Sequence, residues 1–270
     1  MNPRLRAALL ARRRKRGVAG GETPHPRRGD GYEFAELREY EAGDDPRRID
    51  WAATARAGEV QTRVMFEDHA LVLAGALDAS RSMFVGRDRS LYAIAHDALE
   101  TWYALGAPDD RCARILPDTA IADARRRGRS AAQLCSSLRD EEGSSFERTL
   151  RIACAAVPRD ALLLIVSDFY DLEAHAPLLR ALAVRCDCTA LLARDPWSSG
   201  LPLGGFVRLR DAESGVSRRV YIGKRERAAF AAAVAEREAR VLSSLASMGM
   251  RCGVLERDPE RALLEAFGVA

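Results

Sequence analysis

The sequence predicts an α/β fold in which a mostly parallel sheet is covered by helices on both faces. Residues 70–77 and 161–167 form almost continuous apolar runs, which suit strands that are buried on both sides. Between such runs, apolar residues recur at intervals of three and four, as they do on one face of an amphipathic helix. Strands that alternate with helices are typical of a doubly wound parallel sheet, because each parallel connection needs a crossover.

The individual elements are expected from these periods and from local start and stop signals. Alternation over residues 60–66 predicts an edge strand that leads into the central strand at 70–77. Asp258 and Pro259 predict the start of a last short helix, and Gly268 predicts its end. In chain order, the other expected elements are helix 91–105, strand 112–116, helices 131–138 and 146–156, strand 161–167, helix 172–183, strand 188–193, a β-hairpin inserted over 206–222, helix 225–248 and strand 251–255.

Composition bounds the class of protein. The 270 residues are 47% hydrophobic and 30% charged, which is enough apolar material for one sizeable core. No apolar run approaches the ~20 residues that span a bilayer, and no signal peptide is recognisable, so we expect a soluble, cytoplasmic protein. The six cysteines form no Cys-x-x-Cys pair, and we expect them to be buried thiols in a reducing compartment.

Residues 1–27 are expected to form a basic, flexible arm. The first 28 residues contain nine Arg or Lys and a single acid, Glu22. Residues 5–16 could form a short helix, whereas residues 17–31 are rich in Gly, Pro and Arg and suit a loop. A charge run of this kind is usually solvated; the alternatives are contact with an acidic partner, a membrane surface or nucleic acid.

Short oxygen-bearing side chains follow two of the predicted strands. Strand 70–77 runs into Asp78-Ala79-Ser80-Arg81-Ser82, strand 161–167 runs into Asp168, and Gly143-Ser144-Ser145 adds hydroxyls on a loop before a helix. The carboxyl ends of parallel strands share one edge of a sheet, where ligands commonly bind. Magnesium prefers about six hard oxygen ligands, so this edge is a candidate metal site. Ordinary helix caps are the alternative interpretation.

This pattern resembles the metal-ion-dependent adhesion site of von Willebrand factor A domains, which combines Asp-x-Ser-x-Ser with a distant Thr and a distant Asp. The resemblance implies that the metal ligands are Asp78, Ser80, Ser82, Ser145 and Asp168. Ser145 stands where that family has Thr, and the choice between Ser144 and Ser145 is open. The resemblance also implies a von Willebrand A-like, Rossmann-like domain over residues 67–270, and a bound ion that is Mg²⁺, Mn²⁺ or Ca²⁺.

A second resemblance lies upstream. It is carried by Glu33-Phe34, Arg38-Glu39-Tyr40, Gly43-Asp44-Asp45, Arg47-Arg48-Ile49-Asp50-Trp51 and Ala55-Arg56. This series resembles the one found in the family of domain of unknown function 58. In that family, the series precedes a von Willebrand A-like domain. The resemblance implies an association with MoxR-type AAA+ ATPases.

Residues 28–66, which carry this series, interleave charged side chains with aromatic and aliphatic ones. Arg-carboxylate pairs and aromatic anchors could lock an irregular segment onto a domain. We therefore expect a collar with little regular structure, in which Phe34 and Trp51 are well buried. A direct partner-binding surface is the alternative.

Two classes of function fit the candidate site. The first is a metal-dependent protein-interaction module, not an enzyme, in which the ion keeps one position open for a Glu or Asp of a protein partner. The family resemblance implies that this partner is a MoxR-type AAA+ ATPase or its client, in chaperone-like or complex-assembly tasks. A specific nucleic-acid partner is not expected, because the arm lacks the interleaved aromatics of single-strand binders.

The alternative is a divalent-metal hydrolase that uses the same site. Such an enzyme needs a general base that takes a proton from metal-bound water. The histidines, His25, His69, His96 and His175, sit in no motif beside the expected ligands, and His96 is expected on a helix. The sequence therefore favours the interaction module.

Overall fold

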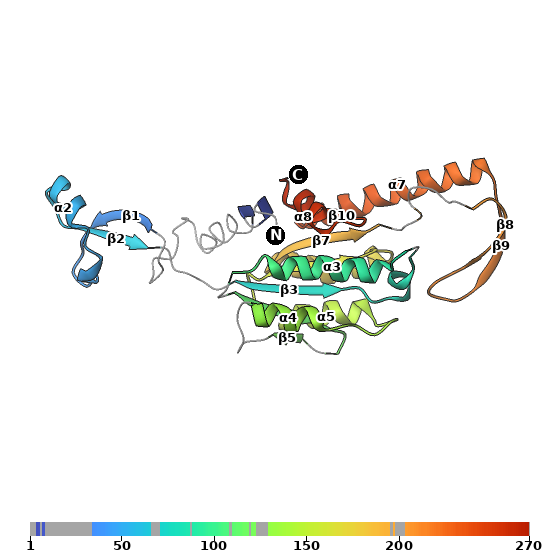
Figure 1. Ribbon diagram of the computed structural model, residues 1–270, viewed down its shortest axis with the longest axis horizontal. Coiled ribbons are helices and arrows are strands. Elements are labelled where there is room, and N and C mark those ends of the chain that lie inside the picture. The colour runs from blue at the N-terminus through green and yellow to red at the C-terminus, as the bar shows by residue number, and fades with distance from the viewer. Residues whose placement is uncertain are drawn as a thin grey trace. The chain divides into compact units, whose positions relative to one another are not determined.

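The computed structural model describes residues 4–5, 7–8, 34–65, 71–86, 88–107, 110–118, 120–122, 129–194, 197 and 203–269 (Figure 1). The chain divides into two compact units, one formed by Leu9–Ala70 and the other by Met1–Ala8 with Leu71–Ala270. Arg4, Leu5, Ala7 and Ala8 are helical. The rest of the basic arm, residues 1–27, lies outside the described residues, so the expectations for it stay predictions.

The larger unit is built on a six-stranded sheet with the strand order β10-β7-β6-β3-β4-β5. Neighbours among the first five of these strands run parallel, and β5 pairs antiparallel with β4 at the edge. The parallel strands are β3 (Val72–Leu77), β4 (Arg111–Ile115), β6 (Leu162–Ser167), β7 (Asp187–Ala193) and β10 (Arg251–Leu255), and the edge strand is β5 (Ala120–Ala122). The predicted mixed α/β fold with a mostly parallel sheet is therefore confirmed, while β5 was not expected.

Helices pack on both faces of this sheet. They are α3 (Leu91–Ala104), α4 (Arg129–Ser137), α5 (Phe146–Ala156), α6 (Leu172–Arg185), α7 (Lys224–Ser247) and α8 (Pro259–Phe267). Successive side chains of a strand point to opposite faces. In β3, Ala74 and Ala76 belong to the core that contains buried residues of α5, α6 and α7. Gly75 points the other way, where an added Cβ would lie 2.0 Å from Leu99 of α3. Glycine is needed here because helix and strand approach so closely.

The insertion after β7 is the predicted β-hairpin. Strand β8 (Gly205–Arg210) pairs antiparallel with β9 (Ser217–Ile222), and α7 begins directly afterwards. The exposed face of this ribbon carries Phe206 and Tyr221, whose rings lie 5.2 Å apart at their centroids. The hairpin belongs to the larger unit, so its turn can be placed relative to the sheet.

The smaller unit corrects the expectation of an irregular collar. Strand β1 (Phe34–Glu39) pairs antiparallel with β2 (Gln61–Met65), and the short helices η1 (Pro46–Arg48) and α2 (Trp51–Ala57) lie between them in the chain. The helices form because their ends are capped locally. Asp45 and Asp50 each accept backbone N–H groups at a helix start, and Gly58 ends α2 in the left-handed conformation. Strand β2, expected at the edge of the central sheet, pairs with β1 instead.

Ion pairs connect residues within the smaller unit, but its tryptophan is not buried. Arg38 lies 2.5 Å from Asp44, and Arg63 lies 2.8 Å from Asp50. Trp51, at the first position of α2, is 70% exposed, so the expectation that it is buried is wrong. The buried residue of that helix is Ala53. The side chain of Phe34 lies outside the described residues.

Two further expectations concern the whole chain. None of the described helices is long and apolar enough to cross a membrane. Of the six cysteines, four are buried and two are partly buried. Burial raises the pKa of Cys112 to about 12 and that of Cys252 to about 11, which makes both thiols poor nucleophiles.

Candidate functional site

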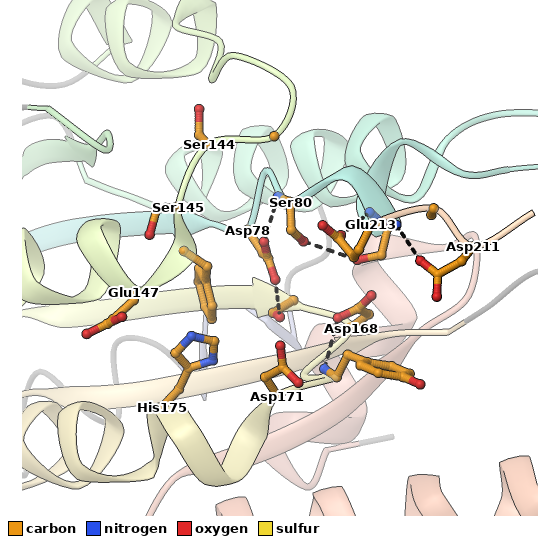
Figure 2. Close-up of a pocket in the computed structure, with 16 residues that line it drawn as sticks. Asp78, Ser80, Ser144, Ser145, Glu147, Asp168, Asp171, His175, Asp211 and Glu213 are labelled. Carbon is orange, nitrogen blue, oxygen red and sulfur yellow. Dashed lines mark hydrogen bonds between the residues drawn. The ribbon is translucent and has the colours of Figure 1, made fainter. Parts of the chain in front are cut away.

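The Asp-x-Ser-x-Ser segment folds into a tight loop at the carboxyl end of β3. Asp78 is only 4% exposed, and its Oδ1 accepts the backbone N–H of Ser80 at 2.8 Å. The hydroxyls of Ser80 and Ser82 lie 3.1 Å apart, just before and within the short helix η2 (Arg81–Phe84). The loop therefore gathers one carboxylate and two hydroxyls in one place, and Figure 2 shows two of these residues, Asp78 and Ser80, side by side.

The neighbouring strand β6 ends beside this loop. The N–H of Asp78 donates to the carbonyl of Val166 at 2.8 Å, and the hydroxyl of Ser167 donates to Asp78 Oδ2 at 2.6 Å. Asp168 follows Ser167, and its Oδ1 accepts the N–H of Tyr170 at 3.0 Å. Between them Phe169, which is buried, has a φ of +48°, a conformation rare for a residue with a large side chain. Such strain often persists where the surrounding structure holds a functional turn.

A third segment completes the site. The N–H of Gly143 donates to the carbonyl of Ala79 at 2.7 Å, which ties the 143–145 loop to the Asp78–Ser82 loop. Ser145 is the N-cap of α5 and accepts the N–H of Arg148. Ser144 donates to the carbonyl of Glu141 at 2.5 Å. Both serines line the same cavity, and the choice between them as the hydroxyl ligand stays open.

These loops surround a cavity of 620 Å³ that brings together every residue expected at the metal site. Its lining includes Asp78, Ser80, Ser82, Ser144, Ser145, Glu147, Ser167, Asp168, Asp171, His175, Asp211 and Glu213 (Figure 2). None of the described residues that line it is Arg or Lys. The cavity is therefore rich in oxygen atoms and lined by acidic side chains.

The electrostatics of Asp78 follow from this placement. Burial raises the pKa of Asp78, and the nearby charge of Asp168 raises it further. The hydrogen bonds from Ser167 and Ser80 oppose that rise, because they stabilise the ionised carboxylate. A cation between the two aspartates would favour the ionised form of both. The described residues contain no group of three or more His, Cys, Asp or Glu side chains that could hold a metal, so such a cation would depend on two carboxylates and on hydroxyls.

The sequence did not reveal that Glu213 would reach this site. Glu213 lies in the turn of the β8–β9 hairpin, 131 residues after Ser82, yet its Oε1 accepts the N–H of Ser82 at 2.8 Å. Arg81 also donates to the backbone carbonyl of Glu213 at 3.3 Å. A hairpin can be predicted from its own sequence, but the surface that its turn contacts cannot.

A histidine also lines the cavity, although no histidine lies in a sequence motif beside the expected ligands. His175, on α6, lines the cavity and packs edge-on against Phe146, with the ring centroids 5.2 Å apart. Among the described residues, no group hydrogen-bonds to its buried Nδ1. His96 is buried on α3, as a helix residue beside Arg139, and His25 and His69 lie outside the described residues.

A buried polar network supports the loop that carries Ser144 and Ser145. Arg114 of β4 is fully buried, forms an ion pair with Asp140, and donates to the carbonyls of Gly75 and Ile115. Tyr92 of α3 donates to Asp140 Oδ2 at 2.8 Å. Burial, together with the charge of Asp140, raises the pKa of Tyr92 to about 12, so the phenol stays protonated. The network fixes the start of the loop to two elements of the core.

Taken together, the fold and the site define a class of protein: an α/β domain with a mostly parallel sheet and an acidic, hydroxyl-rich cavity at the carboxyl ends of adjacent strands. The chain belongs to the family described as protein of unknown function DUF58, whose model matches residues 36–240. It is 30% identical, over 264 aligned residues, to uncharacterized proteins of Mycobacterium bovis and Mycobacterium tuberculosis, covering 92% of this chain and 83% of theirs.

Two solved structures are also similar to the chain. One is an aerotolerance-related membrane protein from Bacteroides fragilis, with a TM-score of 0.43 and 14% identity over 73% of this chain and 98% of that one. The other is the conserved hypothetical protein BatB from Bacteroides thetaiotaomicron, with a TM-score of 0.37 and 16% identity over 67% of this chain and 99% of that one.

Proposed function

We propose that this chain is a metal-dependent protein-interaction module, with a von Willebrand A-like domain that holds a divalent cation at the cavity. Its ligands would be Asp78, Ser80, Ser82, Ser145 and Asp168. The observation that carries the proposal is their convergence. Three segments far apart in the sequence place these side chains around one cavity, at the ends of neighbouring parallel strands.

The chemistry of the donors suits Mg²⁺, and also Mn²⁺ or Ca²⁺. All the proposed ligands offer hard oxygen atoms, and such cations take oxygen ligands while Mg²⁺ keeps several waters. Two carboxylates and a few hydroxyls leave coordination positions for solvent or for a partner. A Glu or Asp of a protein partner would take such a position, since the cation is the source of positive charge in an otherwise acidic cavity.

The partner that we propose is a MoxR-type AAA+ ATPase or a client of one, in a chaperone-like or complex-assembly task. This part of the proposal is supported by the motifs of residues 33–56, which resemble the family that is associated with such ATPases. It does not rest on the geometry of the cavity. A partner-binding role for the smaller unit is compatible with the exposure of Trp51.

A divalent-metal hydrolase is the second candidate, and one observation favours it. His175 lines the cavity, so a possible general base does lie near the proposed ligands. The buried Nδ1 of its ring, beside Phe146, argues for a packing role, which keeps this candidate second. Hydrolysis of phosphoester or peptide substrates by the Mn²⁺-loaded protein, lost in His175→Ala, would reverse that order.

Binding to the ATPase tests the proposed function. The full-length chain would be titrated with the MoxR-type ATPase from the same genome, in Mg²⁺ and in excess chelator. We expect complex formation in Mg²⁺, and a loss of at least tenfold in affinity with chelator or in Asp168→Ala. Glu236→Ala, which removes an exposed carboxylate of α7, is the matched control and should bind like the wild type. Equal binding with and without chelator would refute metal dependence.

A further inference from the structure

The turn of the β8–β9 hairpin is built to present Glu213. Asp211 Oδ1 accepts the N–H groups of Glu213 at 2.9 Å and of Ser214 at 2.8 Å. The N–H of Gly215 donates to the carbonyl of Asp211, and Gly215 adopts a φ of +71° that closes the turn. The hydrogen bonds to its carboxylate, chiefly the one from the N–H of Ser214, lower the pKa of Asp211, so the carboxylate that caps the turn is ionised at neutral pH.

This turn rests on the loop that would hold the cation. The carboxylate of Glu213 accepts the N–H of Ser82, and the carbonyl of Glu213 accepts from Arg81. Ser82 is itself one of the proposed ligands. Figure 2 shows Glu213 beside Ser80 and Asp78, at the side of the cavity from which the hairpin enters. A carboxylate of the chain itself therefore lines the cavity that an acidic side chain of a partner would enter.

The contact between Glu213 and the Asp78–Ser82 loop is of a kind that another acidic group can replace. Both hydrogen bonds that Glu213 accepts from the Asp78–Ser82 loop are exposed to solvent, and exposed polar contacts contribute little to stability. The cavity already contains the carboxylates of Asp78 and Asp168, and no described Arg or Lys lines it. These carboxylates repel a further acidic group unless a backbone N–H or a cation compensates its charge. Glu213 uses the N–H of Ser82.

We infer that Glu213 is an internal competitor of the partner: it holds the hairpin turn over the Asp78–Ser82 loop, and an acidic side chain of the partner must displace it to reach the cation. The inference rests on the proposed function, because it assumes a metal-bound site that accepts a carboxylate. It adds a residue and an element, the β8–β9 hairpin, that determine how readily the site is occupied.

A pair of substitutions at one position separates competition from simple electrostatics. Glu213→Gln removes the charge but keeps an oxygen that can accept from Ser82, whereas Glu213→Ala removes both. The probe is a blocked Gly-Ala-Glu-Ala-Gly peptide, titrated in Mg²⁺ and followed by NMR, with the Gln version of the peptide as its control. We expect Glu213→Ala to bind the Glu peptide at least fivefold more tightly than the wild type, with Glu213→Gln in between and no change for the Gln peptide.

Hydrogen exchange gives a second readout that does not depend on the peptide. The Ser82 N–H should exchange at least tenfold faster in Glu213→Ala, and at the wild-type rate in the control Glu236→Ala. Equal gains in peptide affinity for Glu213→Ala and Glu213→Gln would show that charge alone acts and would overturn the inference. So would equal affinities of the wild type and Glu213→Ala, while Mg²⁺ binding by both would leave the proposed function standing. If neither protein binds Mg²⁺, the proposed function fails and the inference falls with it.

Discussion

The hydroxyl of Ser167 donates to Asp78 Oδ2 at 2.6 Å, across the carboxyl ends of the neighbouring strands β6 and β3. This bond makes the residue before Asp168 a direct support of the buried carboxylate of Asp78. It links the two halves of the candidate metal site directly. Several of the consequences that follow can be measured in the metal-free protein.

Ser167→Ala should destabilise the metal-free protein at neutral pH by about 1–3 kcal/mol, because a buried carboxylate loses a hydrogen-bond donor. It should also raise the pKa of Asp78 further, since that bond favours the ionised form. Urea unfolding at pH 7 measures the first effect. Ser247→Ala, which removes an exposed hydroxyl of α7, is the control and should change the free energy of unfolding by less than about 0.5 kcal/mol. An equal loss in both variants would contradict the supporting role of Ser167.

The stability of the metal-free protein should depend on pH through Asp78. Its pKa is raised in the folded state, mainly by burial, so its favourable contribution is present below the unfolded pKa and is lost as the pH rises through the folded pKa. Asp78→Asn removes this dependence. The variant should therefore gain stability relative to the wild type as pH rises above about 4, by roughly 1.4 kcal/mol per pH unit until the folded Asp78 ionises. Parallel stability curves for the two proteins, measured by denaturant unfolding between pH 4 and 7, would exclude a raised pKa.

Breaking the buried Arg114–Asp140 pair should be costly. Arg114→Met leaves the carboxylate of Asp140 buried without its guanidinium, and we expect a loss of about 3–5 kcal/mol. The double variant Arg114→Met with Asp140→Asn should recover part of that loss, because no lone buried charge remains. Unfolding free energies of the single and double variants measure this coupling. Simple additivity would mean that the pair does not act as a unit.

The close approach of β3 and α3 gives a packing prediction. In Gly75→Ala, the new methyl group would overlap Leu99 and lie 2.9 Å from the hydroxyl of Tyr103. The expected cost is about 1–3 kcal/mol, since a well-packed core accommodates added volume poorly. Gly204→Ala is the control, because its nearest neighbouring atom is 3.8 Å from the added Cβ. Thermal unfolding of both variants decides the matter, and equal melting temperatures would count against the helix–strand contact.

Much of the fold could be predicted because its signals are local. The apolar runs that became β3 and β6 have no other stable place than the middle of a covered sheet. The last helix begins at Pro259 after the Asp258 cap and ends before Gly268, which has a positive φ, as the residue types require. The convergence of Asp78 and Asp168 followed from the same reasoning, since both come after strands that proved to be neighbours.

What could not be predicted depends on contacts between distant segments. The pairing of β1 with β2 is decided by registry between strands, and the same alternation would suit the edge of the main sheet equally well. The exposure of Trp51 depends on which side of α2 faces strand β2, and the seven residues of the helix do not reveal that side. Glu213 and His175 reach the cavity from a hairpin turn and from α6, where neither lies in a recognisable motif.

The central claim is that the cavity holds a divalent cation through Asp78, and its most direct test is the thermal shift of the full-length chain with Mg²⁺, Mn²⁺ or Ca²⁺. At an ion concentration about 100 times the Kd, the wild type should gain roughly 2.7 kcal/mol, which corresponds to a rise of about 5–10 °C in Tm. Asp78→Ala should lose the shift while its metal-free Tm falls little or even rises, because a buried carboxylate near Asp168 has been removed. Glu236→Ala should keep the full shift. A wild type that no divalent ion stabilises, or an Asp78→Ala protein that keeps the full shift, would contradict the claim.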